Sequence, residues 1–283
     1  MKLVADLRGM QRMAEDLRRE GRRISVVPTM GFLHEGHLSL IRIARQNSDT
    51  VITTIFVNPT QFSPTEDFES YPRDLERDKR LAESAGSDLL FVPAPDEMYP
   101  KEYLTFVTVE KITDVLEGKV RPSHFRGVVT VVAKLINLTK PHVAVFGQKD
   151  AQQAAVVTRM IGDLNFDCEV IVAPTVREPD GLAMSSRNVY LSPEDRLRSA
   201  VLFRSLTLAG ELVKNGERNS AEIISAMRKL IATQASARID YISVADRLTL
   251  EELPLLTPGE ALVSLAVRFG TTRLIDNIIV RVP

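Results

Sequence analysis

The chain contains 283 residues, of which 44% are hydrophobic and 26% charged, and its formal net charge is −1. This composition is typical of a globular protein with enough apolar residues to form a sizeable core. A net charge so close to zero creates no global field that would attract nucleic acid, so we expect no nucleic-acid partner. No apolar run approaches the length of about 18 residues that a membrane-spanning helix needs, so we expect no membrane span.

The single cysteine, Cys168, lies in the apolar run 168–172 and is expected to be a buried small hydrophobe, not a nucleophile. One cysteine excludes a disulfide within the chain and is typical of a reducing compartment. The first residues form a charged amphipathic pattern that does not resemble a signal peptide. These features together predict a cytoplasmic protein.

Strand-like and helix-like segments alternate up to about residue 175. Apolar runs predict strands at 24–27, 50–57, 88–92, 143–146 and 169–173, and amphipathic stretches predict helices at 36–47, 73–85, 126–139 and 150–164. The β-branched residues of 126–139 leave a strand as the alternative there. The mixed-sign run 73–80 predicts a solvated helix face. Apolar strands separated by amphipathic helices favour an α/β fold with a Rossmann-like, doubly wound parallel sheet.

A domain boundary is expected near residues 174–179, where prolines gather. Downstream, the pattern predicts helices at 193–213 and 221–233 and strands at 239–244, 261–268 and 273–280, the last two joined across 269–272. We therefore expect a Rossmann-like domain at 1–175 and a smaller C-terminal α+β domain at 176–283.

Two of the four histidines, His34 and His37, follow the predicted strand 24–27. Pro28 and Gly31 are expected to end that strand, and a helix is expected to begin soon after. Free N–H groups at a helix start attract phosphate, and imidazoles add further donors, so this arrangement suits a nucleoside triphosphate. The pattern H-x-x-H is common by chance, and no third ligand of metal type lies nearby to make it a zinc site.

Two more polar loops follow predicted strands, at 58–62 and at 147–150. Because the carboxyl ends of parallel strands meet at one edge of a sheet, we expect these loops and the histidine pair to form one site. Gly147 allows close backbone approach, Lys149 offers a charge to phosphates, and Asp150 can accept from ribose hydroxyls or cap the helix. A surface turn is the alternative for this segment.

Amide and hydroxyl side chains complete the candidate site. Gln61 and Gln153 can each donate and accept hydrogen bonds, as recognition of a hydroxy acid requires. The segment 183–188 carries two hydroxyls and the guanidinium of Arg187, which suit a phosphate clamp, although a capped turn before the next helix is the alternative. Because this segment lies just beyond the expected boundary, we expect the C-terminal domain to act as a lid over the nucleotide.

Taken together, these stretches resemble the family of pantoate–β-alanine ligases, or pantothenate synthetases. Residues 30–37 resemble the signature of the wider HIGH-motif nucleotidyltransferase superfamily, and the stretches 56–62, 146–150 and 184–188 narrow the resemblance to this family. The resemblance covers essentially the whole chain, and the C-terminal part is less distinctive than the first 190 residues.

The resemblance implies a reaction in two steps. The carboxylate of (R)-pantoate attacks the α-phosphorus of ATP and releases pyrophosphate, and β-alanine then attacks the pantoyl adenylate to give pantothenate and AMP. The resemblance also implies Mg²⁺ bridging the ATP phosphates, small-molecule substrates only, and a homodimer. Pantoate and the nucleotide would bind to the first domain.

The resemblance assigns catalytic roles to four residues. His34 and His37 would bind phosphates and stabilise charge on the pentavalent phosphorus, with His37 as proton donor, and Lys149 and Arg187 would add positive charge. Adenine would meet the backbone of Val176, and Gly147 and Asp150 would take the ribose. The residues implied to bind ATP are Met30, Gly31, His34, His37, Gly147, Lys149, Asp150, Val176, Met184, Ser185, Ser186 and Arg187.

Substrate binding is implied for a second set of residues. Gln61 and Gln153 would hold pantoate, with His124 close to it, and Asn58 would meet the amine of β-alanine. One departure from the family pattern is Gln148, where many relatives carry Glu, and the role of this side chain is left open.

Two other functions are compatible with part of this pattern. The same histidines occur in cytidylyltransferases and in aminoacyl-tRNA synthetases, but a synthetase should carry a basic surface for RNA, which the near-neutral charge does not suggest. A catalytically silent nucleotide-binding regulator is the alternative from a different class. The presence of both histidines together with Lys149 and Arg187 argues against it, and ATP turnover would decide.

Overall fold

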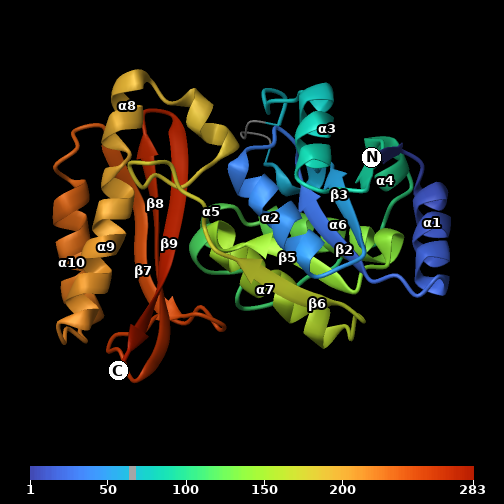
Figure 1. Cartoon of the computed structure of the whole chain (residues 1–283). Coiled ribbons are helices and arrows are strands. Elements are labelled where there is room, and N and C mark those ends of the chain that lie inside the picture. Colours follow the sequence, from blue (N-terminus) through green and yellow to red (C-terminus); the bar gives the residue numbers. More distant parts are fainter. Residues whose placement is uncertain (64–67) are drawn as a thin grey trace. The chain divides into compact units, whose positions relative to one another are not determined.

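The structure, a computed structural model, describes residues 1–63 and 68–283. The chain forms two compact units (Figure 1). The N-terminal unit comprises Met1–Gly147 and Val156–Pro174, and the C-terminal unit comprises Gln148–Ala155 and Thr175–Pro283. The C-terminal unit thus includes a short segment that precedes the boundary expected near 174–179. Within the described ranges, no helix is long and apolar enough to cross a membrane.

A six-stranded parallel sheet forms the centre of the N-terminal unit, with the order β1-β4-β3-β2-β5-β6. Its strands are β1 (Lys2–Val4), β2 (Ile24–Thr29), β3 (Thr50–Ile55), β4 (Leu89–Phe91), β5 (Val143–Gly147) and β6 (Glu169–Ala173). The expected α/β class and the expected strands are confirmed. Strand β1 was not expected, because three residues are too few to show a periodic pattern.

Pro28 does not end β2, contrary to the expectation. The strand continues to Thr29, and Pro28 pairs with Thr54 of β3. The neighbour on the other side, β5, pairs with β2 only at Ser25 and Val26. Proline removes a donor from a ladder, and it is tolerated here because β5 no longer pairs at this end of β2.

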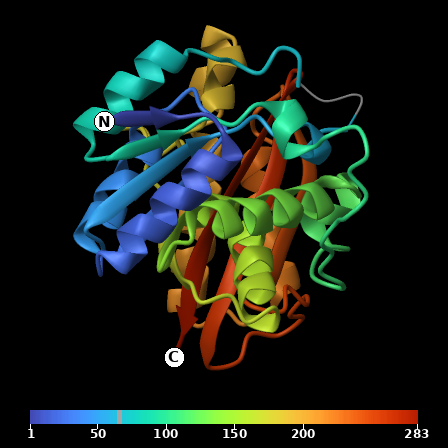
Figure 2. The ribbon, with the colours of Figure 1, turned by 90° about the vertical axis from the view of Figure 1, so that its right-hand side faces the viewer.

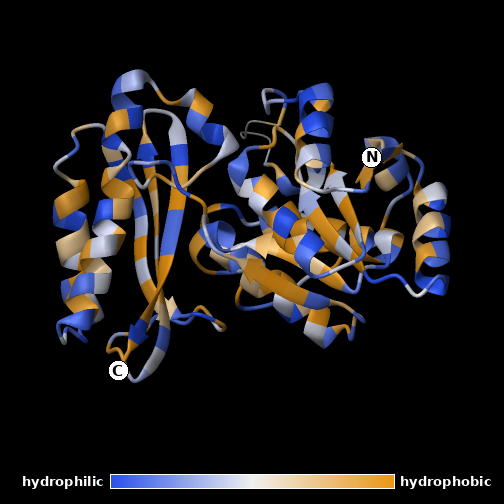
Figure 3. Cartoon of the chain, viewed as in Figure 1, coloured by the Kyte–Doolittle hydropathy of each residue, from blue (hydrophilic) through white to orange (hydrophobic). Residues whose placement is uncertain are grey.

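Helices cover both faces of the parallel sheet. One face packs against α1 (Leu7–Arg19), α6 (His124–Thr139) and α7 (Ala151–Asp163), and the other against α2 (Glu35–Gln46) and α3 (Leu75–Ser84). Successive residues Val26 and Val27 of β2 point into the two different cores. In Figure 3 the strands are mostly white to orange and helices such as α1 carry both blue and orange, as burial of one helix face requires.

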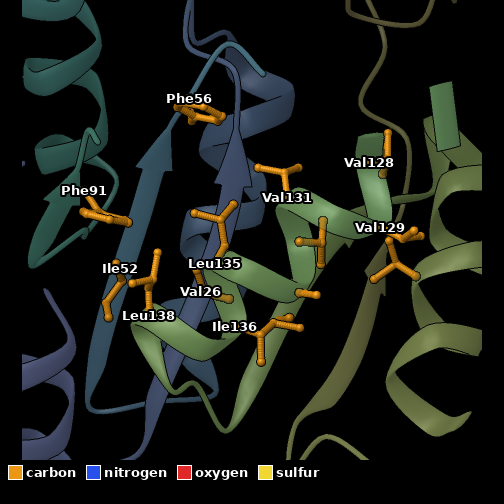
Figure 4. Close-up of a cluster of buried hydrophobic side chains, with 14 of the residues drawn as sticks. Val26, Ile52, Phe56, Phe91, Val128, Val129, Val131, Leu135, Ile136 and Leu138 are labelled. Carbon is orange, nitrogen blue, oxygen red and sulfur yellow. The ribbon is translucent and has the colours of Figure 1, made fainter. Parts of the chain in front are cut away.

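The β-branched stretch near residue 130 is helical, which excludes the alternative strand. Figure 4 shows Val131, Leu135 and Leu138 of α6 among the side chains of Val26 and Ile52 from the sheet. Burial of this apolar stripe outweighs the weak intrinsic preference of valine for strands.

A glycine in the first turns of α6 allows a close approach to η1 (Pro59–Gln61). A Cβ atom on Gly127 would lie 2.4 Å from the carbonyl oxygen of Thr60. Any larger residue would therefore push the helix away from this short turn, which carries Gln61.

The C-terminal unit contains a three-stranded antiparallel sheet of β7 (Ala237–Asp246), β8 (Gly259–Phe269) and β9 (Thr272–Val282). Its strands lie side by side in Figures 1 and 2, and α9 (Val201–Lys214) and α10 (Ser220–Ile231) pack on the sheet. Gly270, with φ +56°, forms the expected tight connection between β8 and β9. The three expected strands are confirmed.

The expected single helix at 193–213 is wrong, because the structure has α8 (Pro193–Arg198) and α9 in its place. Ser199 lies between the two helices, and its hydroxyl donates to the carbonyl of Arg196 at 2.8 Å. At this junction the N–H of Leu202 donates to the carbonyl of Ser199, three residues earlier, at 3.1 Å, and such a tight turn interrupts the α-helical pattern.

Candidate active site

The strand order reverses at β2, because β3 and β4 follow on one side of it and β5 and β6 on the other. In doubly wound sheets, ligands bind at the carboxyl ends of the strands at such a switch point. The end of β2 leads into the loop 30–34, and β5 ends at Gly147. Two of the expected polar segments therefore begin at the switch point.

The two histidines of the signature lie together at the start of α2. His34 is the N-cap residue, in an extended conformation, and His37 is three positions further on. Their ring centroids are 4.1 Å apart. His37 Nδ1 accepts the backbone N–H of His34 at 3.3 Å, which favours the tautomer with its proton on Nε2. The pair thus adds imidazole donors to a helix N-terminus that already favours anions.

The sequence predicted a solvated helix face for the run 73–80. The structure corrects this prediction, because one residue of the run is buried. Asp78 of α3 is buried, and its carboxylate accepts the backbone N–H groups of Phe32 and Leu33. Burial raises the pKa of Asp78, and the two backbone donors and Arg77 oppose that shift. An acidic residue that looked like surface charge therefore holds the loop between β2 and the histidine pair.

Asn58 and Gln61 form a buried polar group beside α6. Asn58 Nδ2 donates to Gln61 Oε1 and to the carbonyl of Gly127, both at 3.1 Å. The Oδ1 atom of Asn58 accepts from the backbone N–H and the hydroxyl of Thr60. These bonds fix the amide of Gln61 with its Nε2 as a donor, and that donor lies 3.0 Å from the sulfur of Met30.

His124 contacts the backbone of Gln61. Its Nδ1 lies 3.0 Å from the Gln61 carbonyl, and Arg121 Nη1 lies 3.1 Å from its Nε2. Because a guanidinium cannot accept a hydrogen bond, His124 accepts at Nε2 and donates at Nδ1. The expected residues Met30, Gln61, Asn58 and His124 are thus brought into one group.

The turn η2 (Gln148–Asp150) belongs to the C-terminal unit and is held by Asn277 of β9. Gln148 Nε2 donates to Asn277 Oδ1 at 2.9 Å, and Asn277 Nδ2 donates to the carbonyls of Gln148 and Lys149, each at 2.9 Å. The Lys149 Nζ atom lies 3.6 Å from Asp150 Oδ1. The structure thus gives Gln148 a role that the sequence left open: its side chain bonds to the residue that fixes the turn.

A buried ion pair adjoins Asn277 in the C-terminal unit. Arg177 makes two hydrogen bonds to Asp276, at 2.6 and 3.0 Å, and a third to the carbonyl of Gly181. Burial raises the pKa of Asp276, although Arg177 opposes the shift. The guanidinium also lies 4.1 Å from the centroid of the Phe203 ring. These contacts tie the start of the segment 176–188 to β9.

The rest of the segment 176–188 is held by short-range bonds. The carbonyl of Val176 accepts the N–H of Met184 at 3.0 Å. Ser185 caps η3 (Ser186–Tyr190), because its hydroxyl accepts the N–H of Arg187 at 3.3 Å. A capped turn was the alternative to a phosphate clamp for the segment 183–188. The structure has a capped turn there, and two residues of the expected clamp, Ser185 and Arg187, form it.

The expected site residues fall into the two units as follows. The N-terminal unit holds Met30, Gly31, His34, His37, Asn58, Gln61, His124 and Gly147, and the C-terminal unit holds Lys149, Asp150, Gln153, Val176, Met184, Ser185, Ser186 and Arg187. Sequence reasoning missed Asp78 and Asn277, which no motif distinguishes.

Cys168 is half-buried and burial raises the pKa of its thiol to about 12, which does not suit a nucleophile.

Comparison with known proteins decides the family. The model of the family described as pantoate-beta-alanine ligase matches residues 2–279. The chain belongs to the pantoate–β-alanine ligase family. A pantothenate synthetase of Acetivibrio thermocellus is 56% identical over 279 residues, covering 99% of this chain and 98% of the relative. One from Heliobacterium modesticaldum is 54% identical, covering 100% of both chains.

Solved structures of pantoate–β-alanine ligases are similar over the whole length. The pantothenate synthetase of Thermus thermophilus has a TM-score of 0.93 and 46% identity, covering 98% of this chain and 99% of that one. The ligase of Francisella tularensis, described as complexed with β-γ ATP and β-alanine, has a TM-score of 0.79 and 32% identity, covering 99% and 97%. The family resemblance expected from four short stretches is thereby confirmed over the whole chain.

Proposed function

We propose that the chain condenses pantoate with β-alanine in an ATP-dependent reaction that gives pantothenate, AMP and pyrophosphate through pantoyl adenylate. The observation that carries this function is the family match over residues 2–279. The histidine pair at the carboxyl end of β2 gives the match a chemical basis. The enzyme is thus an AMP-forming ligase that uses ATP as a substrate.

The first step joins a carboxylate to a polyanion, so electrostatic repulsion opposes it. The N–H groups at the start of α2 and the Nε2–H group of His37 are donors that we assign to the phosphates and to the charge developing on phosphorus. We assign His34 to the phosphates as well. We propose that Lys149 and Arg187 bring positive charge to the leaving pyrophosphate.

We assign pantoate to Gln61 and Gln153, with His124 holding the backbone of Gln61. A direct contact between Asn58 and the amine of β-alanine stays a prediction. The bonds of Asn58 to Gln61, Gly127 and Thr60 support an orienting role for this side chain instead. In that role Asn58 fixes which end of the Gln61 amide is the donor, because it occupies the Oε1 atom.

For ATP, we propose that Gly147 and Asp150 take the ribose, while the backbone of Val176 meets adenine. The remaining phosphate-binding and loop positions that we assign to ATP are Met30, Gly31, Met184, Ser185 and Ser186. Asn277 fixes the turn η2, and Ser185 fixes the backbone at Arg187. This order supports the assignment, because ordered donors bind phosphate with less loss of entropy.

For Mg²⁺, the described part of the chain contains no group of three or more His, Cys, Asp or Glu side chains that could hold a metal ion. We therefore propose that the ion is held chiefly by the phosphates of ATP, as is common for this hard and strongly hydrated cation. A homodimer and a cytoplasmic location are likewise proposals, which rest on the family resemblance and on composition.

Pyrophosphate exchange tests the proposed function. Exchange of labelled pyrophosphate into ATP should require pantoate and should proceed without β-alanine. A requirement for β-alanine, or release of ADP and phosphate, would contradict the adenylate mechanism. Binding of ATP without any turnover would support the silent regulator.

A further inference from the structure

Asp78 of α3 makes two short hydrogen bonds to the backbone of the signature loop. Its Oδ2 atom accepts the N–H of Phe32 at 2.6 Å, and its Oδ1 atom accepts the N–H of Leu33 at 2.7 Å. Only 1% of the residue is exposed. A carboxylate that accepts two adjacent backbone N–H groups fixes both the position and the direction of that stretch of chain.

The loop needs such a restraint because its backbone is strained. Gly31 has φ +84° and Phe32 has φ +49°, so two successive residues lie in the left-handed region. For a residue with a side chain, such a conformation is unfavourable and persists only where its surroundings impose it. The guanidinium of Arg77 lies 5.0 Å from the centroid of the Phe32 ring and adds a second restraint from α3.

The restrained loop connects two parts of the candidate site in the N-terminal unit. At one end, the sulfur of Met30 contacts the amide of Gln61. At the other end, Leu33 directly precedes His34, whose N–H bonds to His37 Nδ1. A small shift of the loop would therefore move the donor that fixes the His37 tautomer.

We infer that Asp78 is a positioning residue for adenylate formation, which holds the loop 30–33 so that His34 and His37 keep their relative geometry. It acts through backbone N–H groups and touches no substrate. This inference rests on the proposed function, because the step it affects is the attack on ATP.

The test uses Asp78→Asn, which keeps the shape of the side chain but replaces one acceptor oxygen by an NH₂ group facing an N–H donor. The matched control is Asp74→Asn, since the Asp74 carboxylate caps the same helix by accepting the N–H of Arg77. Pantoate-dependent pyrophosphate exchange gives kcat and the KM for pantoate, and nitrogen NMR of the imidazoles reports the His37 tautomer.

We expect Asp78→Asn to lower the kcat of exchange at least about tenfold and to alter the His37 ring signals, with a KM for pantoate within about threefold of the native value. Asp74→Asn keeps a capping acceptor and should leave both kcat and the His37 ring signals close to native. A folded Asp78→Asn protein with kcat within about twofold of native, or a loss of melting temperature alone, would overturn the inference.

A second variant keeps the test decisive if Asp78→Asn does not fold. Gly31→Ala leaves Asp78 intact, but its Cβ would lie 3.1 Å from Asp78 Oδ2 and 3.0 Å from Ile55 Cγ2, at a φ of +84°. It should displace the loop from the carboxylate and reproduce both the loss of kcat and the change in the His37 signals. Native His37 signals in folded Gly31→Ala would contradict the inference. If the family reaction itself were wrong, the native protein would show no pantoate-dependent exchange, which separates the two failures.

Discussion

Asn277 and Gln148 bond to each other twice, since the side-chain amide of Gln148 donates to Asn277 Oδ1 and Asn277 Nδ2 donates to the Gln148 carbonyl, both at 2.9 Å. The same Nδ2 atom also donates to the carbonyl of Lys149. Both residues are at least partly buried, so these bonds are shielded from competition with water. The turn that carries Lys149 is therefore held in place by β9.

The first prediction separates the two partners of this contact. Asn277→Ala removes all three hydrogen bonds and should raise the KM for ATP about tenfold or more, because the turn loses its fixed conformation. Gln148→Ala removes one bond and leaves the two carbonyl contacts, so it should change the KM for ATP by less than about threefold. Steady-state kinetics of both variants, with melting curves to verify folding, gives the comparison. Equal increases in the KM for ATP would mean that the hydrogen bonds from Asn277 to the two backbone carbonyls do not affect ATP binding.

The second prediction concerns His37 and Gln61. His37→Ala should slow adenylate formation by roughly 10²-fold or more, the scale for the loss of one preorganised donor to a transition state. Gln61→Ala should mainly raise the KM for pantoate, because its proposed partner is present in the ground state as well. Rapid-quench measurement of the adenylate separates the two effects. Small and equal losses in two normally folded variants would remove His37 from the catalytic set.

The third prediction is a pH dependence at the buried pair Arg177 and Asp276. Asp276→Asn replaces the carboxyl by a neutral group of the same shape that does not titrate, so it isolates the contribution of this carboxyl to the pH dependence of stability. Burial raises the pKa of Asp276 above its ordinary value of 3.8, so the folded state keeps this proton to higher pH than the unfolded state. Between 3.8 and the raised value, the native protein therefore loses stability as pH rises, and the asparagine variant does not.

The free energy of unfolding of the native protein, relative to that of Asp276→Asn, should accordingly be higher in mild acid than at neutral pH. Urea unfolding at the two pH values measures it, with Asp180→Asn as the control. The pKa of Asp180 is lowered, chiefly by its hydrogen bond to Arg196, so its stabilising effect is lost as pH falls. A native protein that loses stability relative to Asp276→Asn as pH falls would refute the assigned direction.

The fourth prediction is that nucleotide brings about a compaction in which Arg187 takes part. Solution scattering of native protein with an unreactive ATP analogue should show a smaller radius of gyration than without it, and Arg187→Ala should show no change. Arg187→Lys should not restore the effect, because lysine lacks the planar fork that binds phosphate at two points. Identical profiles in all samples would leave Arg187 as a static phosphate contact at most.

The parallel sheet could be predicted because its strands are apolar on both faces. The runs around Val26, Ile52 and Val145 have few polar positions, and the amphipathic helices between them leave little choice of topology. The position of the histidine pair followed from the same pattern, since loops after parallel strands lie at one edge. The family resemblance then supplied residue roles that spacing alone does not give.

The supporting residues could not be predicted, because their roles depend on contacts distant in sequence. Asp78 lies among other charged residues in the run 73–80 and differs from them only after α3 packs beside the loop. Asn277 lies 129 residues from Gln148. The break between α8 and α9 lies in a stretch whose apolar periodicity continues across it, and it shows only in the backbone, where the N–H of Leu202 bonds to the carbonyl of Ser199 three residues earlier.

The order in which the chain leaves the ribosome has a consequence for the turn η2. The segment Gln148–Ala155 belongs to the C-terminal unit, yet Asn277 is synthesised 129 residues after Gln148. At a synthesis rate of roughly 5–20 residues per second, this interval lasts on the order of ten seconds. During that time β1 to β5 can already pair, while the turn after β5 lacks the bonds that define it. A nascent chain stalled before β9 would therefore carry a formed sheet with Lys149 on an unrestrained loop, and only the last strand to be synthesised fixes that lysine in its turn.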